Sequence, residues 1–133
     1  MNRTEEIELL EQLEQWNSKD EYSQCIQAIE AIPEQERGYL LTVKLSRAYS
    51  NLAVLGDHGV HGTDGEVDGD LIRHAIDLLE SVRTQGENDP YWNSRMGYSC
   101  LMAYRSAATA YEYAKCWLAL APDAPAAQKL VRD

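Results

Sequence analysis

Apolar residues recur along most of this chain at intervals of three or four positions, the spacing that places side chains on one face of an α-helix. Strand-like alternation is nearly absent. The pattern predicts helices with apolar stripes over residues 7–16, 22–32, 41–55 and 72–82. A fifth helix is predicted from Pro90 to a turn at Arg105–Ser106, a sixth from there to Pro122, and a short tail helix over residues 124–131. The residues expected to face the core in the first four are Ile7, Leu10, Leu13, Trp16, Tyr22, Cys25, Ile26, Ile29, Ile32, Leu41, Leu45, Ala48, Tyr49, Leu52, Leu55, Ile72, Ala75, Ile76, Leu79 and Val82.

Capping residues support these boundaries. Asn2 or Thr4 can cap the first helix, and the run from Ser18 to Glu21 fits a capping box at the start of the second. Gly56 is the expected C-terminal stop of the third helix, and Asp68 or Asp70 can cap the fourth. Asn88-Asp89-Pro90 is a start signal for the fifth, because proline at the first helical position lacks only an amide donor that has no partner there.

The segment over residues 56–70 interrupts the helical pattern. It holds five of the eight glycines, four aspartates and two histidines, a composition that predicts an exposed, mobile loop. Asp64, Glu66, Asp68 and Gly69 follow the opening of a calcium loop, but Ala75 stands where a bidentate Glu closes such a site. His58 and His61, with Asp57 and Asp64 close by, form at most a weak transition-metal set. A solvated loop without metal or other cofactor is expected, and a metal-dependent loop switch is the minor alternative.

Charge and composition exclude several classes of partner. The formal net charge of -10 would repel nucleic acid and anionic lipid, so no nucleic acid and no membrane are expected as partners. No apolar run approaches the ~20 residues of a membrane span, and the acidic N-terminus has no secretory signal. Cys25, Cys100 and Cys116 fall on predicted helices and form no CxxC, so they are expected to be small, reduced core residues. A cytoplasmic protein of one domain, residues 1–133, is predicted.

Motifs of catalysis are missing from the sequence. There is no GxSxG, no HExxH and no glycine-rich phosphate loop. A nucleophilic Cys100 or Cys116 would need His74 brought close by folding, and nothing in the sequence indicates this. The sequence therefore predicts that the protein is not an enzyme.

The stretch from Pro90 to Pro122 carries a repeat-like pattern. Tyr91-Trp92 open its first helix and Met96-Gly97 lie at the middle, while Ala110, Ala114, Leu120 and Pro122 are spaced along the second. The stretch resembles a tetratricopeptide repeat, whose pattern runs aromatic, Leu-Gly, Tyr, Ala, aromatic, Ala, Pro; Cys100 and Trp117 replace the Tyr and the last Ala. The runs from Leu45 to Tyr49 and from Asp20 to Ile26 resemble diverged parts of the same repeat.

This resemblance implies an all-α array of about three antiparallel helix hairpins, wound as a right-handed superhelix and closed by a short C-terminal helix. In such repeats the first helix of each hairpin lines a concave groove that binds a protein or peptide. Three of the twelve basic residues, Lys44, Arg47 and Arg95, would converge there, so an acidic partner is expected. The implied groove residues are Leu40, Val43, Lys44, Arg47, Tyr91, Ser94, Arg95 and Tyr98. Alternatively, the charged residues of this set are solvated or paired with neighbouring acids. The tyrosines, likewise, could pack at the boundary between helices instead of contacting a ligand.

A second function remains open from the sequence. An array of hairpins leaves apolar faces at its two ends, and repeat proteins need polar caps to stay monomeric. The short tail over residues 124–131 is a small cap. A self-associating structural protein, forming a homo-oligomer through those end faces, is therefore the alternative to a binding module.

Overall fold

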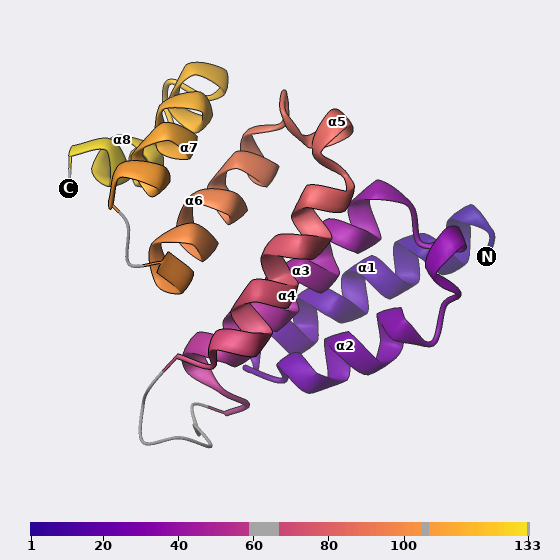
Figure 1. Ribbon diagram of the computed structural model, residues 1–133. Helices are drawn as coiled ribbons and strands as arrows, with labels where there is room; N and C mark the ends of the chain where they lie inside the picture. Colours follow the sequence, from indigo (N-terminus) through magenta and orange to yellow (C-terminus); the bar gives the residue numbers. More distant parts are fainter. Residues whose placement is uncertain (59–66, 105–106, 133) are drawn as a thin grey trace.

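Helices are the regular elements of the part that the structure describes, residues 1–58, 67–104 and 107–132 of a computed structural model (Figure 1). This confirms the all-α prediction. The elements are α1 (Arg3–Ser18), α2 (Tyr22–Glu30), the 3-10 turn η1 (Glu34–Glu36), α3 (Gly38–Leu55), α4 (Gly69–Ser81), α5 (Arg83–Gly86), α6 (Pro90–Tyr104), α7 (Ala107–Leu120) and α8 (Pro125–Arg132).

Neighbours in the sequence are neighbours in space. The closest packing joins α3 to α4 and α6 to α7, while α2 packs on α3, α4 on α6, and α8 on α7. In Figure 1 the helices follow one another across the molecule in chain order, and the two termini lie at opposite ends. An arrangement of this kind buries each helix against the next one, as stacked hairpins do.

Helix α3 joins two hydrophobic clusters. Leu41 and Leu45 pack with Leu13, Cys25 and Ile29 of the first two helices in one cluster. Val43 projects from another side of α3 into the second cluster, formed with residues of α4 and α6 that include Leu79, Trp92, Met96 and Cys100. Because α3 contributes to both clusters, it connects the N-terminal and C-terminal halves of the fold.

Two of the predicted core residues are wrong. Ile7 is 46% exposed and Leu55 is 47% exposed. Helix α2 has nine residues against sixteen in α1, so at ~1.5 Å per residue it spans little more than half of α1 and leaves the turn of Ile7 uncovered. Leu55 is the last residue of α3 and lies beyond the packed turns. The others are buried or half-buried, as predicted.

Most of the predicted boundary signals are confirmed. The Asn2 side chain accepts a hydrogen bond from the Glu5 amide at 2.8 Å, and Asp68 accepts from two amides at the start of α4. Asp89 accepts from the Tyr91 amide at 2.9 Å just before α6. Gly56 ends α3 with a φ of 73°, the left-handed region in which glycine carries no steric penalty.

The predicted capping box from Ser18 to Glu21 is wrong. Ser18 is the last residue of α1, and its hydroxyl donates back to the Gln15 carbonyl at 2.8 Å. Glu21 precedes α2 but makes no capping hydrogen bond with its side chain. A carboxylate from a distant part of the chain, Asp57, accepts from the amide and the hydroxyl of Ser23 instead.

Gly97 lies at the α6–α7 contact, as the repeat pattern predicts. A Cβ added there would lie 3.6 Å from the Ala110 carbonyl oxygen and 3.5 Å from Leu130. These are ordinary van der Waals separations, so the two helices are close but alanine would fit at position 97.

The cysteine prediction is correct for two residues and wrong for the third. All three thiols are free; Cys25 and Cys100 are buried, but Cys116 is exposed on α7. Burial raises the pKa of Cys25 and of Cys100 to about 11. The predicted turn at Arg105–Ser106, and most of the loop with His61, Asp64 and Glu66, lie outside the described residues.

Candidate binding groove

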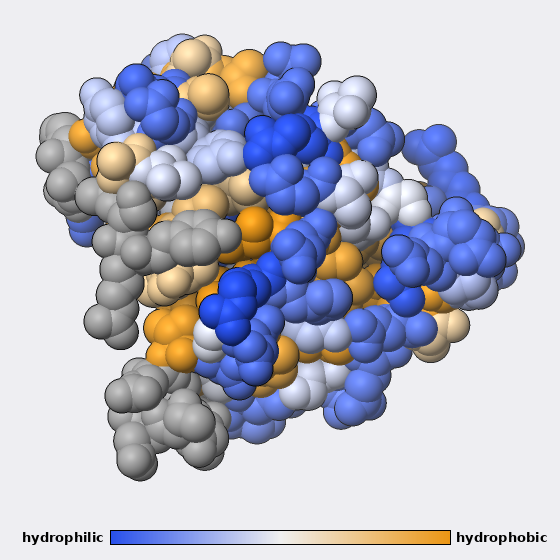
Figure 2. All heavy atoms as spheres, viewed as in Figure 1, coloured by the Kyte–Doolittle hydropathy of each residue, from blue (hydrophilic) through white to orange (hydrophobic). Residues whose placement is uncertain are grey.

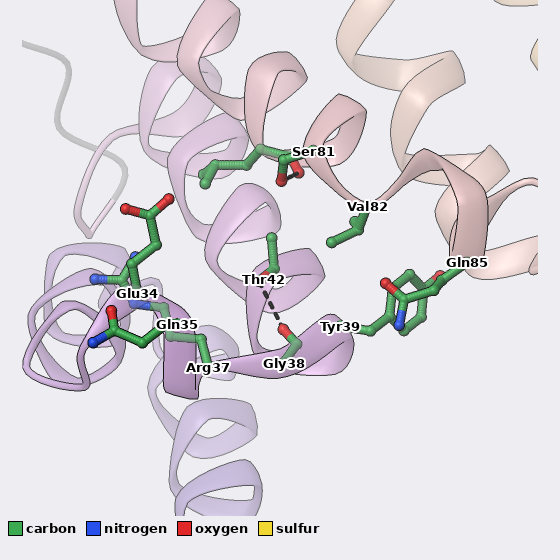
Figure 3. A pocket seen from close by; sticks show the side chains of 10 residues that line it. Glu34, Gln35, Arg37, Gly38, Tyr39, Thr42, Ser81, Val82 and Gln85 are labelled. Atoms are coloured by element: carbon green, nitrogen blue, oxygen red, sulfur yellow. Dashed lines mark hydrogen bonds between the residues drawn. The ribbon is translucent and has the colours of Figure 1, made fainter.

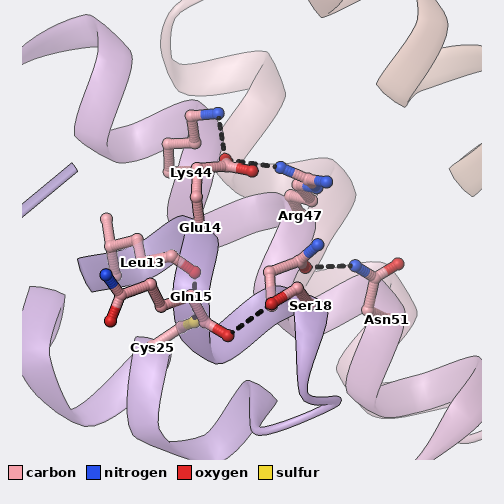
Figure 4. A network of polar contacts seen from close by, with 9 residues as sticks. Leu13, Glu14, Gln15, Ser18, Cys25, Lys44, Arg47 and Asn51 are labelled. Atoms are coloured by element: carbon pink, nitrogen blue, oxygen red, sulfur yellow. Dashed lines mark hydrogen bonds and ion pairs between the residues drawn. The ribbon is translucent and has the colours of Figure 1, made fainter. Parts of the chain in front are cut away.

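A polar cluster joins α1 to α3 on one side of the fold. Figure 4 shows the Glu14 carboxylate between Lys44 and Arg47, with its Oε1 2.9 Å from the Lys44 ammonium and 2.9 Å from the Arg47 guanidinium. The hydrogen bond from Lys44, assisted by the charge of Arg47, holds the pKa of Glu14 below its usual value despite partial burial. The side chain of Asn51 donates to that of Asn17 at 3.1 Å, one helical turn further along.

The same face of α3 reaches α6. The Lys44 ammonium lies 4.9 Å from the ring centre of Tyr91, within the range of a cation–π interaction. Further along, the Arg95 guanidinium donates to the Ser50 hydroxyl at 2.7 Å. Residues of α1, α3 and α6 thus form one continuous polar strip, called the inner strip below: Glu14, Asn17, Lys44, Arg47, Ser50, Asn51, Tyr91, Arg95 and Ser99.

Arg95 is the least compensated charge in the inner strip. Its Nε is buried and has no hydrogen-bond partner, and no carboxylate pairs with its guanidinium among the described residues. Burial lowers the pKa of Arg95, and the positive charge of Arg47 acts in the same direction. A guanidinium that is this well buried normally has an acidic partner.

Two further buried polar atoms near Arg95 also lack partners. The hydroxyls of Tyr91 and Ser99 make no hydrogen bond, and with Arg95 they stand four residues apart along α6, on one face of the helix. Ser99 is only 1% exposed. Buried polar atoms are nearly always paired in folded proteins, and the described residues contain only these three exceptions among side-chain N and O atoms.

A cavity of about 260 Å³ opens beside Arg95 and Ser99. Its remaining wall combines the ends of α3 and α6 with the first turn of α4 and is mainly apolar. The lining residues are Ser50, Asn51, Val54, Leu55, Ile72, Arg95, Tyr98, Ser99 and Met102. Tyr98 is held from behind by Trp117 of α7, whose ring centre lies 5.9 Å away in an edge-to-face contact.

Five of the eight groove residues predicted from the sequence lie in the inner strip or its cavity: Lys44, Arg47, Tyr91, Arg95 and Tyr98. Leu40 is 40% exposed near the start of α3 and lines none of these features. Val43 and Ser94 were predicted wrongly. Val43 is fully buried in the second hydrophobic cluster, and the buried Ser94 hydroxyl donates to the Tyr91 carbonyl at 2.6 Å, so neither can contact a ligand.

Sequence reasoning missed five residues of the inner strip, namely Glu14, Asn17, Ser50, Asn51 and Ser99. Ser99 follows Arg95 by four positions, and that spacing was available as a signal. Glu14 gives no such signal, because its pairing with Lys44 and Arg47 crosses thirty residues of sequence and depends on how α1 packs.

A second, larger cavity of about 440 Å³ lies between η1, the start of α3 and the end of α4 (Figure 3). Several of its polar side chains are already engaged within the protein. Arg37 donates to the Ile32 carbonyl, Thr42 to the Gly38 carbonyl, and Tyr39 to the Asp89 carboxylate. None of the buried, unpaired polar side-chain atoms of the described chain lies in this wall.

Other site types have little support in the described chain. Its His, Cys, Asp and Glu residues nowhere gather in a group of three that could hold a metal ion. The described helices include none with the length and low polarity that a bilayer crossing requires. The face in Figure 2 is largely hydrophilic, and hydrophobic residues reach it near its middle and at the top, over α7.

The chain matches no family model, no curated protein and no solved structure. Its likeness to tetratricopeptide repeats therefore rests on the residues quoted from its sequence.

Proposed function

We propose that the protein is a non-enzymatic binding module, built as a tetratricopeptide-like array of helix hairpins, that holds a protein or peptide on its inner strip. The observation that carries this proposal is the convergence of Lys44, Arg47 and Arg95 on one face, opposed by the single carboxylate of Glu14. In a chain of net charge -10, such a local excess of positive charge favours an acidic partner.

The mechanism is preorganisation. Arg47 is fixed by Glu14, Lys44 by Glu14 and the Tyr91 ring, and Arg95 by Ser50. Because these side chains are already ordered, a ligand that binds them loses less conformational entropy at the interface than on a mobile surface. Tyr91 and Tyr98 add rigid aromatic contact area beside the charges.

The test measures which peptides the protein retains from an array whose members differ in their number of acidic residues. The Lys44→Glu/Arg47→Glu variant is compared with Lys19→Glu/Lys129→Glu, which makes the same charge change at two exposed lysines outside the strip. Wild type and the Lys19/Lys129 variant are expected to retain the same acidic peptides, and the Lys44/Arg47 variant to lose them. Equal retention by both variants would remove the assignment of the inner strip as the binding surface.

Self-association is the second candidate, and one observation favours it. At the N-terminal end of the fold Ile7 is 46% exposed, and Arg3, Glu6, Ile7 and Leu10 border an open hollow along one face of α1. An uncovered apolar turn at the end of a helical array is where a second copy would pack. Light scattering would decide: a concentration-dependent dimer that Ile7→Glu abolishes supports this function, and a monomer at all concentrations excludes it.

The cytoplasm is the compartment we propose. The three free thiols support it, since a reducing environment keeps cysteines unpaired.

A further inference from the structure

We infer that the cavity beside Arg95 binds the carboxylate of an aspartate or glutamate side chain in a partner peptide, together with an adjoining apolar side chain of that peptide. This inference rests on the proposed peptide-binding function and specifies which ligand groups the inner strip recognises.

Two unpaired donors at the cavity, Arg95 Nε and the Ser99 hydroxyl, carry the part of the inference that concerns the carboxylate. Arg95 Nε and the hydroxyls of Tyr91 and Ser99 are buried without partners on one face of α6, and Arg95 and Ser99 line the cavity itself. A carboxylate has about four lone-pair sites and accepts from a guanidinium and a hydroxyl at once. A carboxylate in the cavity would therefore offer an acceptor to Arg95 and Ser99, whose Nε and hydroxyl find none among the described residues; Tyr91 lies outside the cavity wall.

Charge points to an anion rather than a neutral acceptor. Among the residues that the structure describes, the cation Arg47 acts on Arg95 and no carboxylate does. Glu14, the one acidic residue of the strip, is already shared by Lys44 and Arg47. With three cations against the one carboxylate of Glu14, the strip has an excess of two positive charges, and Arg95 pairs with no carboxylate in the described part of the chain. One ligand carboxylate would supply that partner.

The rest of the cavity wall favours an apolar side chain of the peptide beside the carboxylate. Val54, Leu55, Ile72 and Met102 line it, and Leu55 and Met102 are among the few large hydrophobic side chains that are exposed. At ~30 Å³ per water, a volume of about 260 Å³ equals roughly nine waters. That space suits a carboxylate and one aliphatic side chain, and it is smaller than the pockets that hold drug-sized molecules.

The experiment uses the full chain labelled with ¹⁵N and follows the Nε–H signal of Arg95 by NMR. The probes are a short capped peptide with one aspartate between two leucines and the same peptide with asparagine in place of the aspartate. The aspartate peptide is expected to shift the Arg95 signal and to bind about tenfold tighter than the asparagine peptide. Equal affinity of the two peptides would overturn the inference.

Two arginine variants show which cation causes the preference for the aspartate peptide. Arg95→Met keeps the apolar stem of the side chain and removes its charge, so it is expected to abolish the preference for aspartate over asparagine. Arg73→Met makes the same change on the exposed surface of α4, where Arg73 pairs only with Asp70, and is expected to keep the preference. A preference that survives in Arg95→Met would assign the carboxylate to another cation.

Ser99→Ala is a smaller change at the same cavity. It is expected to weaken the preference for aspartate without removing it, and it replaces Arg95→Met in the comparison if that variant does not fold.

The small acid 4-methylpentanoate and its amide separate this inference from the proposed function. If the peptides bind and depend on Lys44 and Arg47 but not on Arg95, the function holds and the cavity assignment is wrong. If only the small acid shifts the Arg95 signal, the cavity takes a carboxylate but the protein does not bind peptides there, and the inference about a peptide ligand is overturned. If neither probe shifts it, the unpaired donors are hydrated and the carboxylate site does not exist.

Discussion

Asp57 caps the start of α2 through Ser23, a residue thirty-four positions before it in the sequence. Its Oδ1 accepts a hydrogen bond from the Ser23 amide at 3.0 Å, and its Oδ2 accepts from the Ser23 hydroxyl. The residue before α2, Glu21, provides no side-chain cap. The bond from the His58 amide to the Asp20 carbonyl, at 2.8 Å, lies beside it. The end of α3 is thereby fastened to the start of α2, in addition to the hydrophobic packing between the two helices.

Replacing Asp57 by alanine is expected to destabilise the fold by about 1 kcal/mol, and by at most ~2 kcal/mol, the usual range for the loss of a helix cap. The free energy of unfolding from urea titrations measures this. Asp77→Ala is the matched control, because Asp77 is exposed on α4 and alanine favours helix there. A loss of stability no larger in Asp57→Ala than in Asp77→Ala would show that the distant cap contributes nothing.

The stability of the protein is expected to fall with pH in the acidic range. Burial favours the neutral form of Asp57, but the hydrogen bonds from Ser23 outweigh it and hold the pKa below its ordinary value of 3.8. The pKa of Glu14 is also lowered, chiefly by Lys44. A carboxyl group whose pKa is depressed in the folded state stabilises above its unfolded pKa and loses that effect as the pH falls through the lowered value.

Asp57→Asn provides the check on this pH dependence, since asparagine can still accept from Ser23 but does not titrate. Measured between pH 7 and about pH 2, the free energy of unfolding should decline less steeply in Asp57→Asn than in wild type. Parallel curves for the two proteins would show that Asp57 has the same pKa folded and unfolded.

Gly86 is expected to be intolerant of alanine. A Cβ at this position would lie 2.3 Å from the indole of Trp92, which is 1% exposed and has no room to move. Gly86→Ala is expected to cost about 1–3 kcal/mol through overpacking. Gly69→Ala is the control, because its Cβ would meet only the Arg73 side chain at 3.5 Å. Thermal unfolding followed by circular dichroism compares them, and equal midpoints would show that the α5–α6 junction can relax.

Trp92 also donates a buried hydrogen bond. Its Nε1–H donates to the Leu79 carbonyl at 2.9 Å in the last turn of α4. Trp92→Phe is expected to cost about 1–3 kcal/mol, from the lost bond and from the space the smaller ring leaves. Trp16→Phe, at a half-buried position without a side-chain hydrogen bond, should cost less. Urea titration measures both, and a larger loss at Trp16 would contradict the role of this bond.

Thiol reactivity is expected to distinguish the three cysteines. Cys116 is exposed, whereas Cys25 and Cys100 are buried and their pKa is raised to about 11. Because the thiolate is the reactive form, a thiol reagent at pH 8 should modify one group rapidly in the native protein and three in denaturant. Cys116→Ser should remove the rapid phase. A rapid phase that survives in Cys116→Ser would mean that a buried thiol becomes accessible.

Much of the candidate groove was predictable, and the missed part has a physical reason. Lys44, Arg47 and Arg95 were visible because basic residues are few and their spacing matched the inner face of a repeat. Val43 was misplaced because an α3 residue can face one of two clusters, and only the position of α4 and α6 decides which. The partners Glu14 and Ser50 depend on contacts between helices that are distant in sequence.

The sequence by itself determined the longer helices, most of their core faces and the boundary signals at Gly56 and Asp89, and it narrowed two further caps to Asn2 or Thr4 and to Asp68 or Asp70. Periodicity and capping are interactions within a few residues, so these features can be read locally. Only the tertiary structure decided that Asp57 caps α2, that Cys116 is exposed, and that Arg95 lies buried beside a cavity without a carboxylate partner among the described residues. Those features depend on which helix faces meet and how far each covers its neighbour. Which faces meet is decided by the packing of the whole chain, so it cannot be read from the residues next to a position in the sequence.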